Sequence, residues 1–130
     1  MPESLLILAP VKRLANREEQ LMLAVWHLRK AFVKDIIARL PDPKPHYNSV
    51  ATTMRILEKK GYASHESLGG TYRYYPLVTA TEYLDQVCSE LTLHFFKDSY
   101  LEMMAYLAHR QNITREGLET LLDQMKGEYL

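Results

Sequence analysis

Apolar residues recur every three or four positions in three consecutive segments of the chain's first half, which is the spacing of amphipathic helices. The first segment follows a capping-box spacing at Asn16 and predicts a helix over about residues 17–30. The second, Val33 to Leu40, predicts a shorter helix with one buried face. The third has Asn48 as its expected N-cap and ends at Gly61. The pattern predicts three short helices.

The hydrophobic period then changes from helical to alternating between residues 62 and 78. The segments "YASHES" and "TYRYYPLV" flank a Gly-Gly pair at residues 69–70, and glycine supplies the positive φ of a tight hairpin turn. Alternation places Arg73 on the strand face opposite Tyr72 and Tyr74, and leaves open which face is exposed. Three helices followed by a hairpin predict a winged helix-turn-helix.

The pattern is helical again from Thr79, which has a second capping-box spacing with Glu82. We predict a mostly α fold with a small β-hairpin wing, in which residues 1–78 form a winged helix-turn-helix and residues 79–130 a helical dimerisation region. A small DNA-binding domain buries little surface against DNA. A two-fold dimer doubles this buried surface and also covers the exposed apolar stripes of its helices. The predicted dimerisation residues are Leu84, Val87, Leu91, Phe95, Leu118, Leu121, Leu122 and Met125.

Charge is distributed unevenly although the formal net charge is zero. Lys and Arg exceed Asp and Glu by five up to Tyr75, whereas Asp and Glu exceed Lys and Arg by five from Thr79 onward. A basic front suits a polyanion such as double-stranded DNA. The single cysteine, Cys88, and the absence of any targeting segment predict a cytoplasmic protein. The apolar run Leu5–Ala9 is too short to span a bilayer, and we expect it to pack.

The third helix carries hydroxyl and guanidinium donors on its predicted exposed side, the groups that meet phosphates and base edges in a major groove. Thr53 lies nearer the core than its neighbours, and lysines, Lys44 among them, are expected to contact phosphates. The predicted DNA-binding residues are Tyr47, Ser49, Thr52, Thr53, Arg55, Lys59, Lys60 and Arg73. The alternative is a winged helix that binds another protein and never touches DNA.

Enzyme and metal functions find little support in the sequence. The five histidines fall on different predicted elements and none has a ligand-like spacing to a cysteine or carboxylate. There is no glycine-rich phosphate loop and no nucleophile elbow. We therefore predict no catalytic residues, no bound metal, no cofactor and no small-molecule substrate.

Two long segments resemble the penicillinase-repressor family, also called BlaI/MecI. They are "YNSVATTMRILEKKGYASHESLGGTYRYYPLVTATEY" and "REEQLMLAVWHLRKAFVKDIIARL", which includes Trp26, and the resemblance runs from about Leu14 to Met125. It implies a homodimeric, sequence-specific transcriptional repressor whose N-terminal winged helix binds a palindromic operator. Where many members have an arginine immediately before the leucine that is Leu57 here, this chain has Ile56 preceded by Arg55.

The resemblance also implies a mode of release. In β-lactamase and methicillin-resistance members, a membrane sensor with a metalloprotease domain leads to cleavage of the repressor at an Asn-Phe bond in the dimerisation region. The corresponding stretch here reads Ala105, Tyr106, Leu107, Ala108 and lacks that bond. Copper-responsive relatives end in closely spaced cysteines, which this chain lacks. The operator sequence, the regulated genes and the inducing signal stay open.

Overall fold

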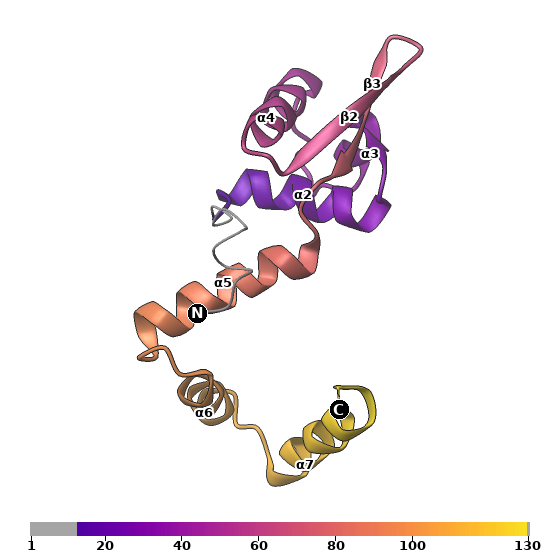
Figure 1. Cartoon of the computed structure of the whole chain (residues 1–130). Helices are drawn as coiled ribbons and strands as arrows, with labels where there is room; N and C mark the ends of the chain where they lie inside the picture. Colours follow the sequence, from indigo (N-terminus) through magenta and orange to yellow (C-terminus); the bar gives the residue numbers. More distant parts are fainter. Residues whose placement is uncertain (1–12, 130) are drawn as a thin grey trace. The chain divides into compact units, whose positions relative to one another are not determined.

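A computed structural model describes residues 13–129 of the chain, so the apolar run Leu5–Ala9 lies outside the described residues (Figure 1). The chain divides into two compact units, Met1–Val87 and Cys88–Leu130, and the division falls inside one helix. Each unit is described by itself. The predicted domain boundary after residue 78 differs from this division by nine residues and stays a prediction.

In its described residues, the first unit holds three helices and a small antiparallel sheet, followed by the start of another helix, which confirms the predicted mostly α fold with a β wing (Figure 1). Its elements are α2 (Asn16–Leu28), β1 (Ala31–Phe32), α3 (Val33–Ala38), α4 (Tyr47–Lys59), β2 (Ala63–Leu68), β3 (Thr71–Pro76) and α5 (Ala80–Phe95). The sheet order is β1-β3-β2. The sequence did not predict β1, because two residues are too few to carry a period and their strand is defined only by pairing with Tyr74 and Arg73.

The capping residues of α2 and α4 differ from the prediction. The residue before α2 is Ala15, whose N–H donates to Glu18 Oε1 at 2.9 Å, so the acceptor lies one residue earlier than the predicted Asn16 and Glu19 pair. Before α4 the N-cap is His46 in extended conformation, and Asn48 lies inside the first turn. Both predictions were wrong by one or two residues, because each helix starts at a residue, Ala15 or His46, that makes no side-chain cap hydrogen bond and so carries no capping signal in the sequence.

The end of α4 and the hairpin turn agree with the prediction. Gly61 has φ 84°, its N–H donates to the Glu58 carbonyl at 3.0 Å, and the Tyr62 N–H donates to the Leu57 carbonyl at 3.0 Å. This Schellman motif requires a residue tolerant of positive φ. In the hairpin both residues of the Gly69-Gly70 turn have positive φ and connect β2 to β3 through a two-residue loop.

The core of the first unit lies between α2, α3, α4 and the sheet. Its fully buried side chains include Leu21, Met22, Val25, Ile36, Val50, Met54, Leu57, Tyr62 and Tyr74. From α5, Tyr83 joins this core, and its hydroxyl donates to Glu19 Oε2 at 2.6 Å while accepting the Leu14 N–H at 3.1 Å. Burial and the hydrogen bond to Glu19 both raise the pKa of Tyr83. The predicted capping box at the start of α5 is confirmed by reciprocal bonds between Thr79 and Glu82.

The second unit is helical, as predicted. It contains the rest of α5, α6 (Tyr100–Arg110), α7 (Arg115–Gln124) and a π-helical turn, Met125–Tyr129. Ser99 and Thr114 cap α6 and α7 by accepting backbone N–H groups of Glu102 and Gly117. Among its described residues only Thr92 is fully buried, so this unit has no apolar core of its own.

A part-buried ion pair gives the first unit a pH-dependent stability. Glu18 Oε2 lies 2.7 Å from Lys60 Nζ and joins the start of α2 to the end of α4. Burial acts to raise the pKa of Glu18, but the Lys60 hydrogen bond, the Ala15 N–H and the Lys60 charge together lower it. The ionised carboxylate therefore stabilises the fold above its ordinary pKa, and this stability is lost as pH falls through the lowered value.

We expect Glu18→Gln to lower the free energy of unfolding by about 1–2 kcal/mol at neutral pH, because glutamine still accepts from Ala15 but carries no charge for Lys60. Urea unfolding of the wild type and the variant, at neutral pH and at about pH 3, measures the difference. The difference should shrink at the lower pH, because the stability that comes from a lowered carboxyl pKa is lost progressively as the pH falls toward it. A difference that stays the same at both pH values would contradict this prediction.

Candidate nucleic-acid interface

The exposed side of α4 presents short polar side chains and a guanidinium. Ser49, Thr52 and Arg55 are exposed, whereas the buried residues of the same helix hold it against the core. Among the described residues, the side chains of these three take part in no hydrogen bond or ion pair. Thr53 is partly buried and its hydroxyl donates to the Ser49 carbonyl at 3.0 Å. The three exposed side chains are therefore available to an external partner, and Thr53 less so.

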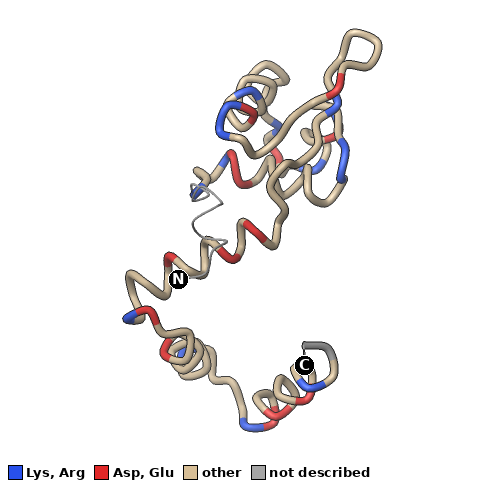
Figure 2. Tube along the Cα trace, viewed as in Figure 1, with Lys and Arg blue, Asp and Glu red and all other residues tan. Residues whose placement is uncertain are grey.

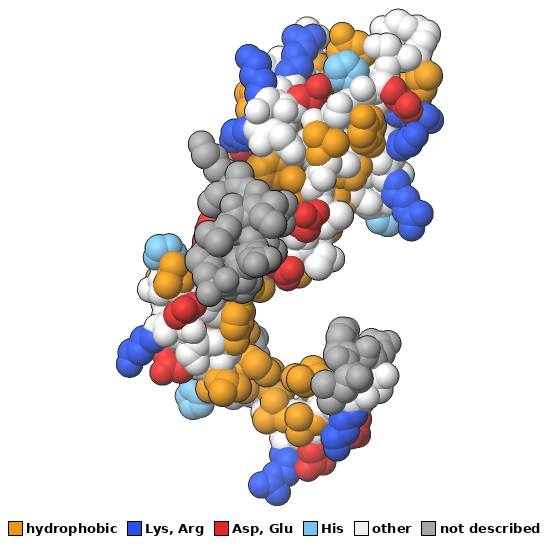
Figure 3. All heavy atoms as spheres, viewed as in Figure 1, with side chains coloured by type: hydrophobic (Ala, Val, Ile, Leu, Met, Phe, Trp, Pro, Cys, Tyr) orange, Lys and Arg blue, Asp and Glu red, His pale blue; other side chains and the backbone are white. Residues whose placement is uncertain are grey.

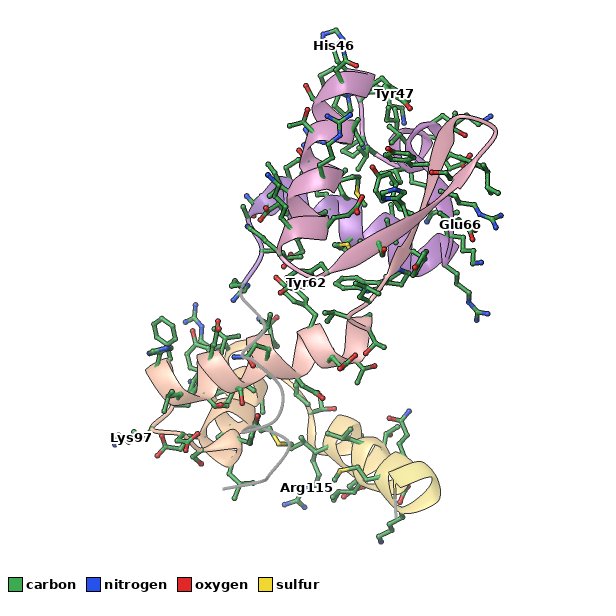
Figure 4. The ribbon with its side chains drawn as sticks, turned by 45° about the horizontal axis from the view of Figure 1, so that its top comes forward. His46, Tyr47, Tyr62, Glu66, Lys97 and Arg115 are labelled. Atoms are coloured by element: carbon green, nitrogen blue, oxygen red, sulfur yellow. The ribbon has the colours of Figure 1, made fainter. Side chains whose placement is uncertain are left out.

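Basic and aromatic residues stand at both ends of α4. Tyr47, at the start of the helix, is 54% exposed, and Figure 4 shows it on the side of the β2–β3 hairpin. Lys59 is exposed near the end of the helix, whereas Lys60 is bound to Glu18. Lys44 precedes α4 and its ammonium donates to the carbonyls of Ala38 and Leu40 at the end of α3. The sequence could not show that Lys44 and Lys60 have partners within the fold whereas Lys59 is exposed.

Burial along β3 depends on the distance from the core as well as on the strand face. Tyr74 is 1% exposed and packs in the core, whereas Tyr72 on the same face lies farther out and is 43% exposed. On the opposite face, Arg73 Nε donates to Glu66 Oε1 at 2.8 Å. That hydrogen bond, acting against a desolvation effect, lowers the pKa of Glu66. The Arg73 charge is thus partly neutralised within the wing.

The wing is joined to α4 through His65, for which the sequence predicted no role. His65 Nδ1 lies 2.7 Å from Glu58 Oε1, and its ring stacks on Tyr72 with centroids 3.8 Å apart and an interplanar angle of 15°. A lone histidine on an alternating strand carries no signal for such a contact, since its partner Glu58 belongs to another element. This contact fixes the outer part of the wing relative to α4.

The predicted dimerisation residues lie in different surroundings. Val87 packs against the core of the first unit, and Leu91 is partly buried. The others are exposed: Leu84 by 59%, Phe95 by 75%, Leu118 by 40%, Leu121 by 39%, Leu122 by 55% and Met125 by 39%. A structural contact that the periodicity did not predict joins the residue just after α5 to α6, where the rings of Phe96 and Tyr106 lie 5.4 Å apart. Figure 3 shows exposed hydrophobic side chains over the C-terminal helices.

Charge follows the division that the sequence predicts. Figure 2 shows Lys and Arg around the helices and wing of the first unit, while Asp and Glu are prominent along α5 and α7. Across residues 13–129 there is no group of three or more metal-ligating side chains that could hold an ion. In the same range no helix is long and apolar enough to cross a membrane.

A three-stranded winged helix-turn-helix with an exposed, polar recognition helix defines a winged-helix protein of the DNA-binding class. The family model described as Penicillinase repressor matches residues 14–127, nearly the whole described chain. The chain belongs to the penicillinase repressor family and is a DNA-binding transcriptional repressor. A search of curated proteins found no match.

Proposed function

We propose that this protein represses transcription by binding as a homodimer to a palindromic operator through α4. The observation that carries this proposal is the free polar side of α4, where Ser49, Thr52 and Arg55 are exposed while the opposite side is anchored in the core. A bidentate guanidinium suits a guanine edge, and threonine suits a phosphate or a thymine methyl. A bound dimer excludes polymerase from the promoter.

The proposed interface assigns different parts to the basic residues. Arg55 reads bases, whereas Lys59 contacts phosphate and contributes equally to every DNA sequence. Lys60 and Arg73 contribute less, because Glu18 and Glu66 already neutralise them. Tyr47 braces the backbone at the start of α4, and Thr53 supports the helix through its bond to Ser49.

The dimer part of the proposal rests on the second unit. A helical segment in which Thr92 is the only fully buried described residue, and which exposes many leucine, methionine and aromatic side chains, needs a partner to cover them. A second copy fits, since a two-fold axis pairs identical stripes and places two recognition helices on two half-sites. We accordingly propose residues 1–78 as the DNA-binding domain and 79–130 as the dimerisation region.

Release from DNA is proposed to follow from loss of the dimer. Proteolysis within the dimerisation region, linked to a membrane sensor with a metalloprotease domain, is the route that family membership suggests. The cleaved bond would differ from Asn-Phe, since residues 105–108 read Ala-Tyr-Leu-Ala and lie within α6. Mass spectrometry of the protein from induced and uninduced cells would identify the cleaved bond, and an intact chain in both would remove this route.

The test of operator binding is selection followed by anisotropy. Fragments bound by the purified protein are selected from the DNA upstream of its own gene and from a random library, and the selected duplex is compared with a shuffled one at two salt concentrations. We expect strong preference for the selected duplex and an inverted repeat in its sequence. Equal weak binding to both duplexes would contradict sequence-specific repression and favour a winged helix that binds a protein.

We expect Arg55→Ala to weaken binding to the selected duplex by about 1–3 kcal/mol and to relax the base preference at one position of each half-site. Lys59→Ala is the control on the same helix, and it should weaken binding to the selected and shuffled duplexes alike while lowering the salt slope by about one per subunit. Anisotropy titrations with both duplexes measure the two effects. Equal losses on both duplexes for Arg55→Ala would remove it from base reading.

A further inference from the structure

A small pocket lies between the start of α3, the start of α4 and the wing. It has a volume of about 210 Å3 and is lined by Phe32, Val33, Lys34, Tyr47, Thr71 and Tyr72. Most of its lining is apolar, and Lys34 is its only charged residue. Sites for small-molecule ligands usually measure roughly 300–1,000 Å3, so this pocket is small for a metabolite. Its size suits one sugar ring or side chain.

The walls of this pocket are fixed by contacts outside it. Tyr72 stacks on His65, which is hydrogen-bonded to Glu58 of α4, so the wing wall is tied to the recognition helix. The Thr71 hydroxyl donates to the Leu68 carbonyl at 2.8 Å and holds the strand at the hairpin turn. The pocket therefore exists before any partner binds, which reduces the entropy lost on binding.

The charge of Lys34 is not neutralised by its neighbours. Asp35, the next residue, accepts the Phe32 N–H at 3.0 Å, and Glu58 is engaged by His65. Within the part of the chain that the structure describes, no carboxylate forms an ion pair with Lys34. The ammonium at the pocket is thus available to an anion.

We propose that this pocket binds one deoxyribose and its phosphate on the operator strand that passes between α4 and the wing, with Lys34 contacting the phosphate and Tyr47 and Tyr72 packing on the sugar. This inference rests on the proposed operator binding through α4. The pocket joins the two elements of that interface, so a DNA backbone in contact with both passes over it. An apolar wall beside one cation matches an apolar sugar face beside one phosphate charge.

The first test uses three variants with the selected operator duplex. Lys34→Ala should weaken binding roughly fivefold to tenfold near 0.1 M salt, on selected and shuffled duplexes alike, and lower the salt slope by about 0.9 per subunit, which is about 1.8 for the bound dimer. Tyr72→Ala should weaken binding without changing the salt slope, and Tyr72→Phe should bind like the wild type because the ring remains. Lys30→Ala is the matched control, since Lys30 is exposed, lies 3.5 Å from Glu66 and does not line the pocket.

The second test locates the contacted phosphate. Operator phosphates are replaced one at a time by uncharged methylphosphonates, and each duplex is titrated with wild type, Lys34→Ala and Lys30→Ala. One linkage in each half-site should weaken the wild type and Lys30→Ala roughly fivefold to tenfold and leave Lys34→Ala unaffected. Two results would contradict the proposed phosphate contact. In one, binding by Lys34→Ala is weakened by the same replacements as binding by the wild type; in the other, Lys30→Ala becomes insensitive to replacement at the same linkage as Lys34→Ala.

The two proposals fail in different ways. A wild type that binds no duplex, or binds all duplexes equally and weakly, overturns operator binding and this inference together. The proposal for the pocket alone is overturned if the wild type binds specifically and Arg55→Ala weakens this binding, but Lys34→Ala and Tyr72→Ala leave it unchanged. Melting curves of each variant establish that the winged unit stays folded, and if Tyr72→Ala destabilises the wing, Lys34→Ala and the methylphosphonate duplexes still decide the role of the pocket.

Discussion

Leu57→Ala should lower the free energy of unfolding of the winged unit by about 2–5 kcal/mol. Leu57 is 0% exposed on the inner side of α4 and packs in the core with Val50 and Met54, so truncation leaves a cavity that the surrounding helices fill only partly. Its carbonyl also accepts the Tyr62 N–H where α4 turns into β2. Because this residue holds the recognition helix in place, operator binding at elevated temperature should fall with stability.

Trp26 provides the measurement. It is the only tryptophan, its indole lies 5.6 Å from the ring of Tyr83, and its Nε1–H donates to the Val78 carbonyl at 2.7 Å. Its fluorescence during urea unfolding therefore reports on the winged unit. The matched control is Ile56→Ala, because Ile56 is the next residue on the same helix but is 42% exposed, and its loss should cost less than about 1 kcal/mol. Equal costs for the two variants would contradict the assigned core of α4.

The helices and the hairpin were predictable because each is marked by local chemistry. Gly61 and the Gly69-Gly70 turn require positive φ, and the capping box of Thr79 and Glu82 is a reciprocal contact between residues three apart. Strand β1 was not predictable, since Ala31 and Phe32 form it only by pairing with β3. Exact helix starts were missed because the N-caps Ala15 and His46 form no side-chain cap hydrogen bond, while Asn16 and Asn48 beside them have the side chains typical of caps.

The candidate site was partly predictable for the same reason. Helical periodicity places Ser49, Thr52 and Arg55 opposite the buried positions of α4, and the structure has them exposed. Pairing between distant residues left no local signal, so the sequence did not reveal that Glu18 holds Lys60, 42 residues away. The positions of Lys34, His65 and Tyr72 around the pocket likewise depend on how α3, α4 and the wing pack together, which periodicity alone does not specify.

Changing both Leu118 and Leu121 to Asp in one chain should convert the dimer to a monomer and weaken operator binding about 100-fold or more. The two leucines lie on one stripe of α7 and are 40% and 39% exposed in the single chain. In the proposed dimer they become buried, and two carboxylates per chain then face their symmetry mates without counter-charge. A monomer binds each half-site separately and loses the gain of linked binding, which is about 10²–10⁴.

Sedimentation at micromolar concentration measures the mass, and anisotropy on the selected duplex measures affinity. The matched control is the double change of Thr120 and Gln124 to Asp, which adds the same charge to exposed polar positions on the other side of α7. The control should keep both the dimer mass and the affinity. If the monomeric variant binds a single half-site as tightly as the wild-type winged unit does, the weaker binding to the full operator results from lost dimerisation and not from damage to the winged unit. If the leucine variant stays dimeric, the interface lies elsewhere, and the exposed faces of α5 and α6 become the next surfaces to test.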